Sequence, residues 1–166
     1  LNEKAKEFDH VIKMGRTQMQ DAVPIRLGQE FKAYSVAIMR DIHRMDKAMD
    51  EMRTLNMGGT AIGTGINADE GYLRRIVPNL TEISGMDFIQ AFDLIDSTQN
   101  LDPFVAVSGA VKACAVTLSK MSNDLRLMSS GPRTGFGEIN LPAKQNGSSI
   151  MPGKVNPVIP EVVNQV

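Results

Sequence analysis

The chain has 166 residues, of which 42% are hydrophobic and 22% charged, and its net charge is −1. These values are typical of one soluble globular domain with a sizeable core, and the charge provides no basic field for nucleic acid or an anionic membrane. No uninterrupted apolar run approaches the length of a membrane span, and no charged-then-apolar start suggests export. A single cysteine, Cys114, excludes an internal disulfide and favours a cytoplasmic location, and with two histidines it gives no metal-ligand spacing.

The hydrophobic pattern predicts helices along most of the chain. Helices are expected over residues 2–12, 28–56, 67–84, 86–99 and 102–128. The stretch from Gly15 to Pro24 breaks the pattern, and Gly85 separates the two shorter central helices. The chain begins with Leu1 inside a charged helical pattern, and it ends soon after a helix-start signal at Pro160-Glu161. We therefore expect a piece of a longer protein.

The helix over 102–128 has the clearest pattern. Asp102 and Pro103 provide a cap followed by proline at the first helical position, and Gly131-Pro132 marks the end. Between them the apolar residues are spaced alternately by four and three: Val107, Val111, Cys114, Leu118, Met121, Leu125 and Met128. Such a sustained seam is typical of helical bundles.

Two helices of this length would each be about 40 Å long at about 1.5 Å per residue. Strand signals are weak, since aromatic residues are few and two-residue alternation is rare. The sequence therefore predicts an all-α fold, an elongated bundle of long helices. One pair of helices cannot cover every apolar position, so we also expect a homo-oligomer.

The segment from Gly147 to Pro157 is the strongest candidate for a functional site. It combines prolines and glycines with Ser148, Ser149, Lys154 and Asn156. Lys154 and backbone N–H groups would supply the positive potential that lets a serine act as a base. The alternative is a plain surface connection, and the residues alone weigh the two interpretations about equally.

Two further segments favour structural roles on their residues alone. Thr17 and Gln18 offer a hydroxyl and an amide for a substrate carboxylate, but a helix-to-helix turn with an Arg16–Asp21 ion pair explains the segment better. The glycine-rich stretch Gly58–Gly65 lacks the Lys-Ser/Thr ending of a phosphate-binding loop, so a tight loop with closely approaching backbones is favoured.

The serine-containing segment matches the signature Gly-Ser-Ser-x-x-Pro-x-Lys-x-Asn of the fumarase/aspartase superfamily at every fixed position. The segments around Thr17, Gly58–Asn67 and Asn123–Arg133 also resemble that superfamily, so the resemblance covers essentially the whole chain. Within it, the chain is most similar to the aspartases. Fumarases have histidine after the threonine, where this chain has Gln18, and the tail 156–165 is similar to that of aspartases.

The resemblance implies the central helical domain, residues 1–166, of a three-domain tetrameric lyase that eliminates ammonia from L-aspartate to give fumarate. It implies that Ser148 is the base and that Ser149 has a supporting role. It also implies that Lys154 and Asn156 bind the substrate carboxylate on which negative charge builds up. Thr17 and Gln18 would bind substrate carboxylate at a site shared with other subunits. Glu161 corresponds to the acid that pairs with the family's histidine, and Gln18 puts that role in doubt. No cofactor or metal is implied.

Two alternatives stay open. The chain could belong to a fumarase or another fumarate-releasing lyase of the same superfamily. As a piece, it could also be an inactive helical oligomerisation module. In either case the resemblance implies that active sites are completed by several subunits, so we expect little activity from these 166 residues alone.

Overall fold

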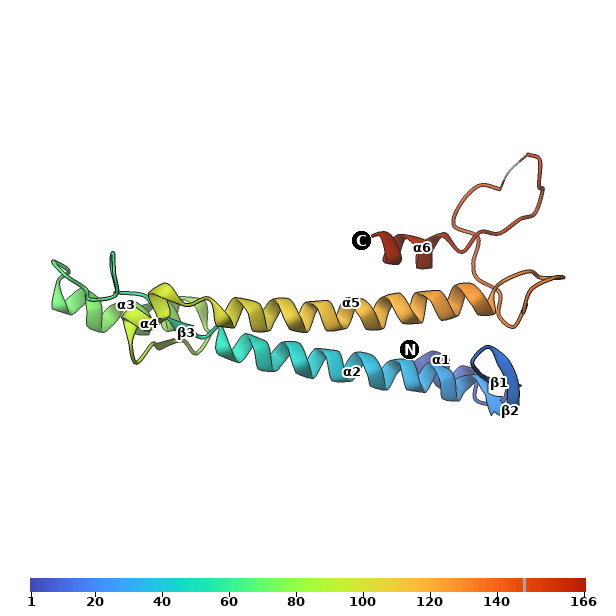
Figure 1. Cartoon of the computed structure of the whole chain (residues 1–166), viewed down its shortest axis with the longest axis horizontal. Coiled ribbons are helices and arrows are strands. Elements are labelled where there is room, and N and C mark those ends of the chain that lie inside the picture. The colour runs from blue at the N-terminus through green and yellow to red at the C-terminus, as the bar shows by residue number, and fades with distance from the viewer. Residues whose placement is uncertain (148) are drawn as a thin grey trace. The chain divides into compact units, whose positions relative to one another are not determined.

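The computed structural model describes residues 1–147 and 149–166 and is mostly helical (Figure 1). The helices are α1 (Asn2–Glu7), α2 (Leu27–Glu51), α3 (Glu70–Ser84), α4 (Leu94–Gln99), α5 (Asp102–Met128) and α6 (Val158–Gln165). The strands are β1 (Ile12–Thr17), β2 (Gln20–Arg26), β3 (Thr54–Leu55) and β4 (Ile89–Gln90). The chain forms two compact units, one of Leu1–Arg40 with Ala113–Val166 and the other of Asp41–Lys112.

The predicted long helices are confirmed. Helix α5 has the predicted bounds, and α2 begins one residue earlier and ends five residues earlier than predicted. Helix α3 begins only at Glu70, because the Asp69 carboxylate caps it by accepting a hydrogen bond from the Tyr72 N–H at 3.1 Å. Gly85 ends α3 in the left-handed conformation, with φ of 69°.

The all-α prediction is wrong in part, because the break from Gly15 to Pro24 belongs to an antiparallel hairpin that leads directly into α2 (Figure 1). Strand β1 pairs with β2 from Ile12 opposite Arg26 to Thr17 opposite Gln20, with a bulge between Met14 and Arg16. The usual Asn-Gly or Asp-Gly turn signal is missing, and Pro24 is a residue that strands generally exclude from their interior. The hairpin therefore forms without the local signals by which strands are recognised.

The predicted helix over 86–99 is also wrong in its first half. Residues Ile89–Gln90 form strand β4, which pairs in parallel with β3 at Thr54–Leu55. Helix α4 follows after Asp93, whose carboxylate accepts hydrogen bonds from the N–H groups of Ile95 and Asp96. Thus each short strand depends on a partner about 35 residues away in the sequence.

The glycine-rich stretch Gly58–Gly65 is a tight loop, as predicted. Gly63 has a φ of 87°, and a Cβ added there would lie 2.4 Å from the Ile95 Cα. Neither the conformation nor the space allows a side chain at this position. The loop therefore fits closely against the start of α4 within its own unit.

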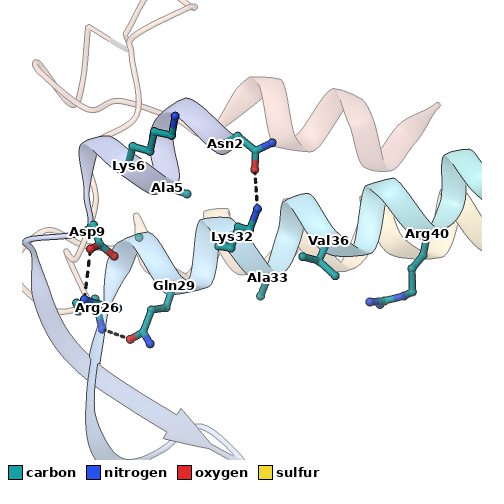
Figure 2. Close-up of a pocket in the computed structure, with 11 residues that line it drawn as sticks. Asn2, Ala5, Lys6, Asp9, Arg26, Gln29, Lys32, Ala33, Val36 and Arg40 are labelled. Carbon is teal, nitrogen blue, oxygen red and sulfur yellow. Dashed lines mark hydrogen bonds and ion pairs between the residues drawn. The ribbon is translucent and has the colours of Figure 1, made fainter.

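The core of the first unit lies where α1 and the end of α5 pack on the start of α2. Its buried residues are Ala5, Leu27, Phe31 and Met128, with Phe8, Val11, Tyr34, Leu125 and Ile139 packed around them. Figure 2 shows the groove between α1 and α2, with the Asp9–Arg26 ion pair at 3.3 Å and the Lys32–Asn2 hydrogen bond at 3.3 Å. This packing fixes the start of α2 and hence the base of the hairpin.

Helix α5 is long and apolar enough to cross a membrane by length and composition alone, although no uninterrupted apolar run reveals this. One such helix is weak evidence, because core helices of soluble proteins pass the same test. Several apolar residues on α5 are exposed: Phe104, Val105, Val111 and Val116.

Candidate active site

The predicted catalytic segment lies between the end of α5 and the start of α6. About ten residues before the segment begins, the chain folds back on α5: the Gly137 N–H donates to the Ser130 carbonyl and the Glu138 N–H to the Met128 carbonyl, each at 2.8 Å. These bonds satisfy carbonyl groups at the helix end and replace the missing helical hydrogen bonds. Residues 137–139, which we call the stem of the serine segment, are therefore fixed to the end of α5.

The second end of the segment is held by α6. The Asn164 amide donates to the Asn123 side-chain oxygen at 2.9 Å, and the Arg126 guanidinium lies 3.6 Å from the Glu161 carboxylate. Both contacts join α6 to the last two turns of α5. Glu161, which the resemblance places opposite a histidine, thus has Arg126 as its partner in this chain.

A cavity of about 720 Å³ lies between this stem, α5 and the later part of the segment. Its lining includes the predicted residues Lys154 and Asn156, together with Asn123, Arg126, Ser130 and Asn140. No carboxylate among the described residues pairs with the Lys154 ammonium. A cation and neutral amides in one cavity suit the binding of a carboxylate whose charge increases during a reaction.

The predicted base, Ser148, lies outside the described residues. Ser149 is exposed and does not line the cavity. Among the described residues, no group of three or more His, Cys, Asp or Glu side chains could hold a metal ion.

Thr17 and Gln18 lie at the tip of the hairpin, where both are exposed. Gln18 and Met19 form its two-residue turn with φ of 50° and 62°. Positive φ at both central residues is the type I′ pattern, which usually requires glycine or asparagine. This turn is strained, and it does not line the cavity that holds Lys154 and Asn156.

A cluster of four charged residues, Lys13, Arg16, Glu30 and Glu138, lies behind the hairpin. The Lys13 ammonium is 3.0 Å from the carboxylates of both Glu30 and Glu138. The Arg16 guanidinium donates to Glu138 at 2.6 Å and lies 4.1 Å from the centre of the Phe136 ring. The expected Arg16–Asp21 pair is confirmed at 3.5 Å, but Asp21 is largely exposed and Glu138 is the closer partner.

The charges of this cluster control the ionisation of Glu138. Burial acts to raise its pKa, but the polar contacts and the positive charges of Lys13 and Arg16 outweigh burial, and the pKa lies below its ordinary value. Glu138 is therefore held as a carboxylate at neutral pH. A lone glutamate in a loop gave no signal in the sequence, so its role was missed.

The fold, the loop signature and the cavity together define a class of protein. A family model described as "Lyase" matches residues 1–166, and the chain belongs to that family.

The similarity to the aspartases, inferred from the residues, is also confirmed. The chain is 57% identical to the aspartate ammonia-lyase of Bacillus subtilis (strain 168) over 100% of its own length and 35% of that protein. It is 52% identical to the enzyme of the same name from Escherichia coli (strain K12), over 98% of this chain and 34% of that protein.

Solved structures show the same relationship. The fumarate lyase:delta crystallin from Brucella melitensis bound to cobalt superposes with a TM-score of 0.95 at 53% identity, over 99% of this chain and 36% of that one. The class II fumarase from Schistosoma mansoni superposes with a TM-score of 0.89 at 36% identity, over 99% and 37%. The chain thus spans about a third of the length of its relatives.

Proposed function

We propose that these 166 residues are the central helical domain of an aspartate ammonia-lyase. The full-length protein would convert L-aspartate to fumarate and ammonia in a reversible anti elimination. The observation that carries the proposal is the identity of 52–60% to aspartate ammonia-lyases along essentially the whole chain. The placement of Lys154 and Asn156 in one cavity supports it.

In the proposed mechanism, the Ser148 oxygen takes a proton from the carbon beside one substrate carboxylate. The electron pair of the broken C–H bond moves into that carboxylate, whose added charge Lys154 and Asn156 stabilise. When this electron pair returns from the carboxylate, it forms the carbon–carbon double bond. The C–N bond of the neighbouring carbon breaks, and the amino group leaves as ammonia. Acidity comes from electrostatic stabilisation, so the mechanism uses no organic cofactor or metal.

Thr17 and Gln18 would bind substrate carboxylate by neutral hydrogen bonds. Ser149 would support the serine segment, and Glu161 would support α6 through Arg126. We further propose a cytoplasmic homo-oligomer, a tetramer, in which other subunits complete each site. The exposed apolar residues of α5 support this assembly, as does the lining of the Lys154 cavity, which includes neither Thr17 nor Gln18.

A second candidate is a fumarase, because the Schistosoma mansoni fumarase superposes over 99% of the chain. Following fumarate by its ultraviolet absorbance, with aspartate and malate as alternative substrates of the full-length protein, separates the two. We expect fumarate from aspartate. Fumarate from malate alone would reverse the assignment in favour of the fumarase.

The base is tested by Ser148→Ala in the full-length protein. We expect nearly all turnover to be lost with little change in the thermal midpoint, because the serine is needed only for proton removal. Undiminished fumarate formation would remove Ser148 from the mechanism. For the 166 residues alone, sedimentation that shows a stable helical oligomer, together with no activity on either substrate, would favour an oligomerisation module for this piece without excluding lyase activity of the full-length protein.

A further inference from the structure

The four-residue charged cluster joins three segments that are distant in sequence. Lys13 and Arg16 belong to β1, Glu30 to the first turn of α2, and Glu138 to the stem of the serine segment. The exposed fractions of the Lys13, Glu138, Arg16 and Glu30 side chains are only 9%, 12%, 21% and 24%. Ion pairs this well shielded are weakly screened by salt, and the planar guanidinium of Arg16 fixes direction as well as distance.

On the hairpin side, the cluster holds the base of the strained turn. Arg16 immediately precedes Thr17 and stands two residues before Gln18. A turn with two positive φ values persists only where its surroundings hold it. Arg16 provides such support through Glu138 and through the face of the Phe136 ring.

On the other side, the cluster holds the stem of the segment that carries Lys154 and Asn156. The backbone N–H of Glu138 is bound to Met128 at the end of α5, while its side chain is bound to the hairpin. Glu138 is therefore fixed from both its backbone and its carboxylate. Movement of the hairpin relative to the stem requires at least one of these contacts to break.

We propose that Lys13, Arg16 and Glu138 are positioning residues for the elimination: they fix the Thr17–Gln18 turn, and separately the stem, to the end of α5, so that each is presented in a defined position to the site that it helps to form. The inference rests on the proposed function for its chemistry. None of the three residues lines the cavity that holds Lys154 and Asn156, so they act through the segments that they hold. A misplacement of about 1 Å at a reacting group reduces turnover by about 100-fold.

The kinetic test uses the full-length protein with Glu138→Gln, Arg16→Met, Arg16→Lys and the control Asp21→Asn. The control removes the exposed carboxylate partner of Arg16, whose side chain is 74% exposed, and leaves Glu138 in place. We expect Glu138→Gln and Arg16→Met to lower kcat/KM by roughly 10- to 100-fold, and Asp21→Asn to leave it within about twofold. Because Glu138→Gln and Arg16→Met both remove the Arg16–Glu138 contact, the effect of the double variant should be smaller than the sum of the two single effects.

Arg16→Lys guards against loss of folding. Lysine retains the positive charge but lacks the planar guanidinium that binds Glu138 and stacks on Phe136. The activity of Arg16→Lys should therefore lie between those of wild type and Arg16→Met. A merely structural cluster would lower the thermal midpoint of these variants without changing kcat or KM of the folded enzyme. That outcome, or Glu138→Gln as active as Asp21→Asn, would overturn the proposal.

Hydrogen exchange on the same proteins separates this inference from the proposed function. We expect Glu138→Gln to accelerate amide exchange at Thr17–Gln20 and at Gly137, and Asp21→Asn to leave it unchanged. Unchanged exchange at the hairpin in Glu138→Gln would overturn the positioning role, whatever the substrate. If wild type produces no fumarate from aspartate while the exchange result holds, the proposed function fails, and the hold of the cluster on the hairpin stands without its link to the elimination.

Discussion

Substituting Gly28 by alanine tests the packing of α1 on α2. A Cβ at this position would lie 2.3 Å from the Ala5 carbonyl oxygen and 2.7 and 2.8 Å from the Asp9 Cα and N. All three are backbone atoms, so no side chain can turn aside to make room. The Gly28 N–H also donates to the Phe8 carbonyl at 3.0 Å, which ties the two segments together.

The expected magnitude follows from this overlap. To restore an ordinary contact, α1 would have to move by about 1 Å, which would withdraw Ala5 from the core it shares with Leu27 and Phe31. Overpacking of this kind costs about 1–3 kcal/mol, and the higher helix propensity of alanine returns up to about 1 kcal/mol. We therefore expect Gly28→Ala to destabilise the chain by about 1–2 kcal/mol.

Gly109 provides the matched control. It lies inside α5, and a Cβ there would meet nothing within 4 Å. Gly109→Ala should therefore stabilise the chain by about 0.5–1 kcal/mol, because only the propensity difference remains. Both variants add the same methyl group to a glycine in a helix. A loss of stability in Gly28→Ala and a gain in Gly109→Ala would therefore isolate the steric contact at Gly28.

Urea unfolding followed by circular dichroism measures both variants against wild type. Because the chain divides into two compact units, amide exchange at Phe8 and Asp9 should accompany the unfolding curves to report on the first unit alone. We expect faster exchange there in Gly28→Ala and no change in Gly109→Ala. Gly28→Ala with stability equal to or above that of wild type would refute the close approach of α1 to α2.

Three further results are expected. The pKa of Glu138 is lower in the folded state, so this carboxylate stabilises the fold above its ordinary pKa of 4.5, and the stabilisation is lost as the pH falls through the lower folded value. Glu138→Gln should therefore flatten the acid dependence of the urea midpoint. Burial, and then the hydrogen bond and charge of Asp124, raise the pKa of Tyr34, so stability should decline above about pH 10, and this slope should disappear in Tyr34→Phe. Lys154→Met in the full-length protein should lower turnover by about 100- to 1,000-fold with a stability change within about 0.5 kcal/mol; Lys144→Met is its exposed control, and equal activity of the two would contradict the role of Lys154.

The long helices were predictable because their signals are local. In α5 the four-three spacing, Pro103 at the start and Gly131-Pro132 after the end all lie within or beside the helix. The strands were not predictable in this way. The hairpin turn uses Gln18 and Met19 in conformations that side chains normally avoid, and β3 requires β4.

The sequence by itself determined the loop signature and therefore identified Lys154 and Asn156 as candidates for carboxylate binding. Their types and spacing are chemical facts that need no fold. Only the tertiary structure decided that they share a cavity with Arg126 at the end of α5, and that Arg126 is the partner of Glu161. It also decided the contact of Glu138 with Arg16, which spans 122 positions of sequence. No local pattern specifies such a pair, because its two residues are brought together by the packing of the elements between them.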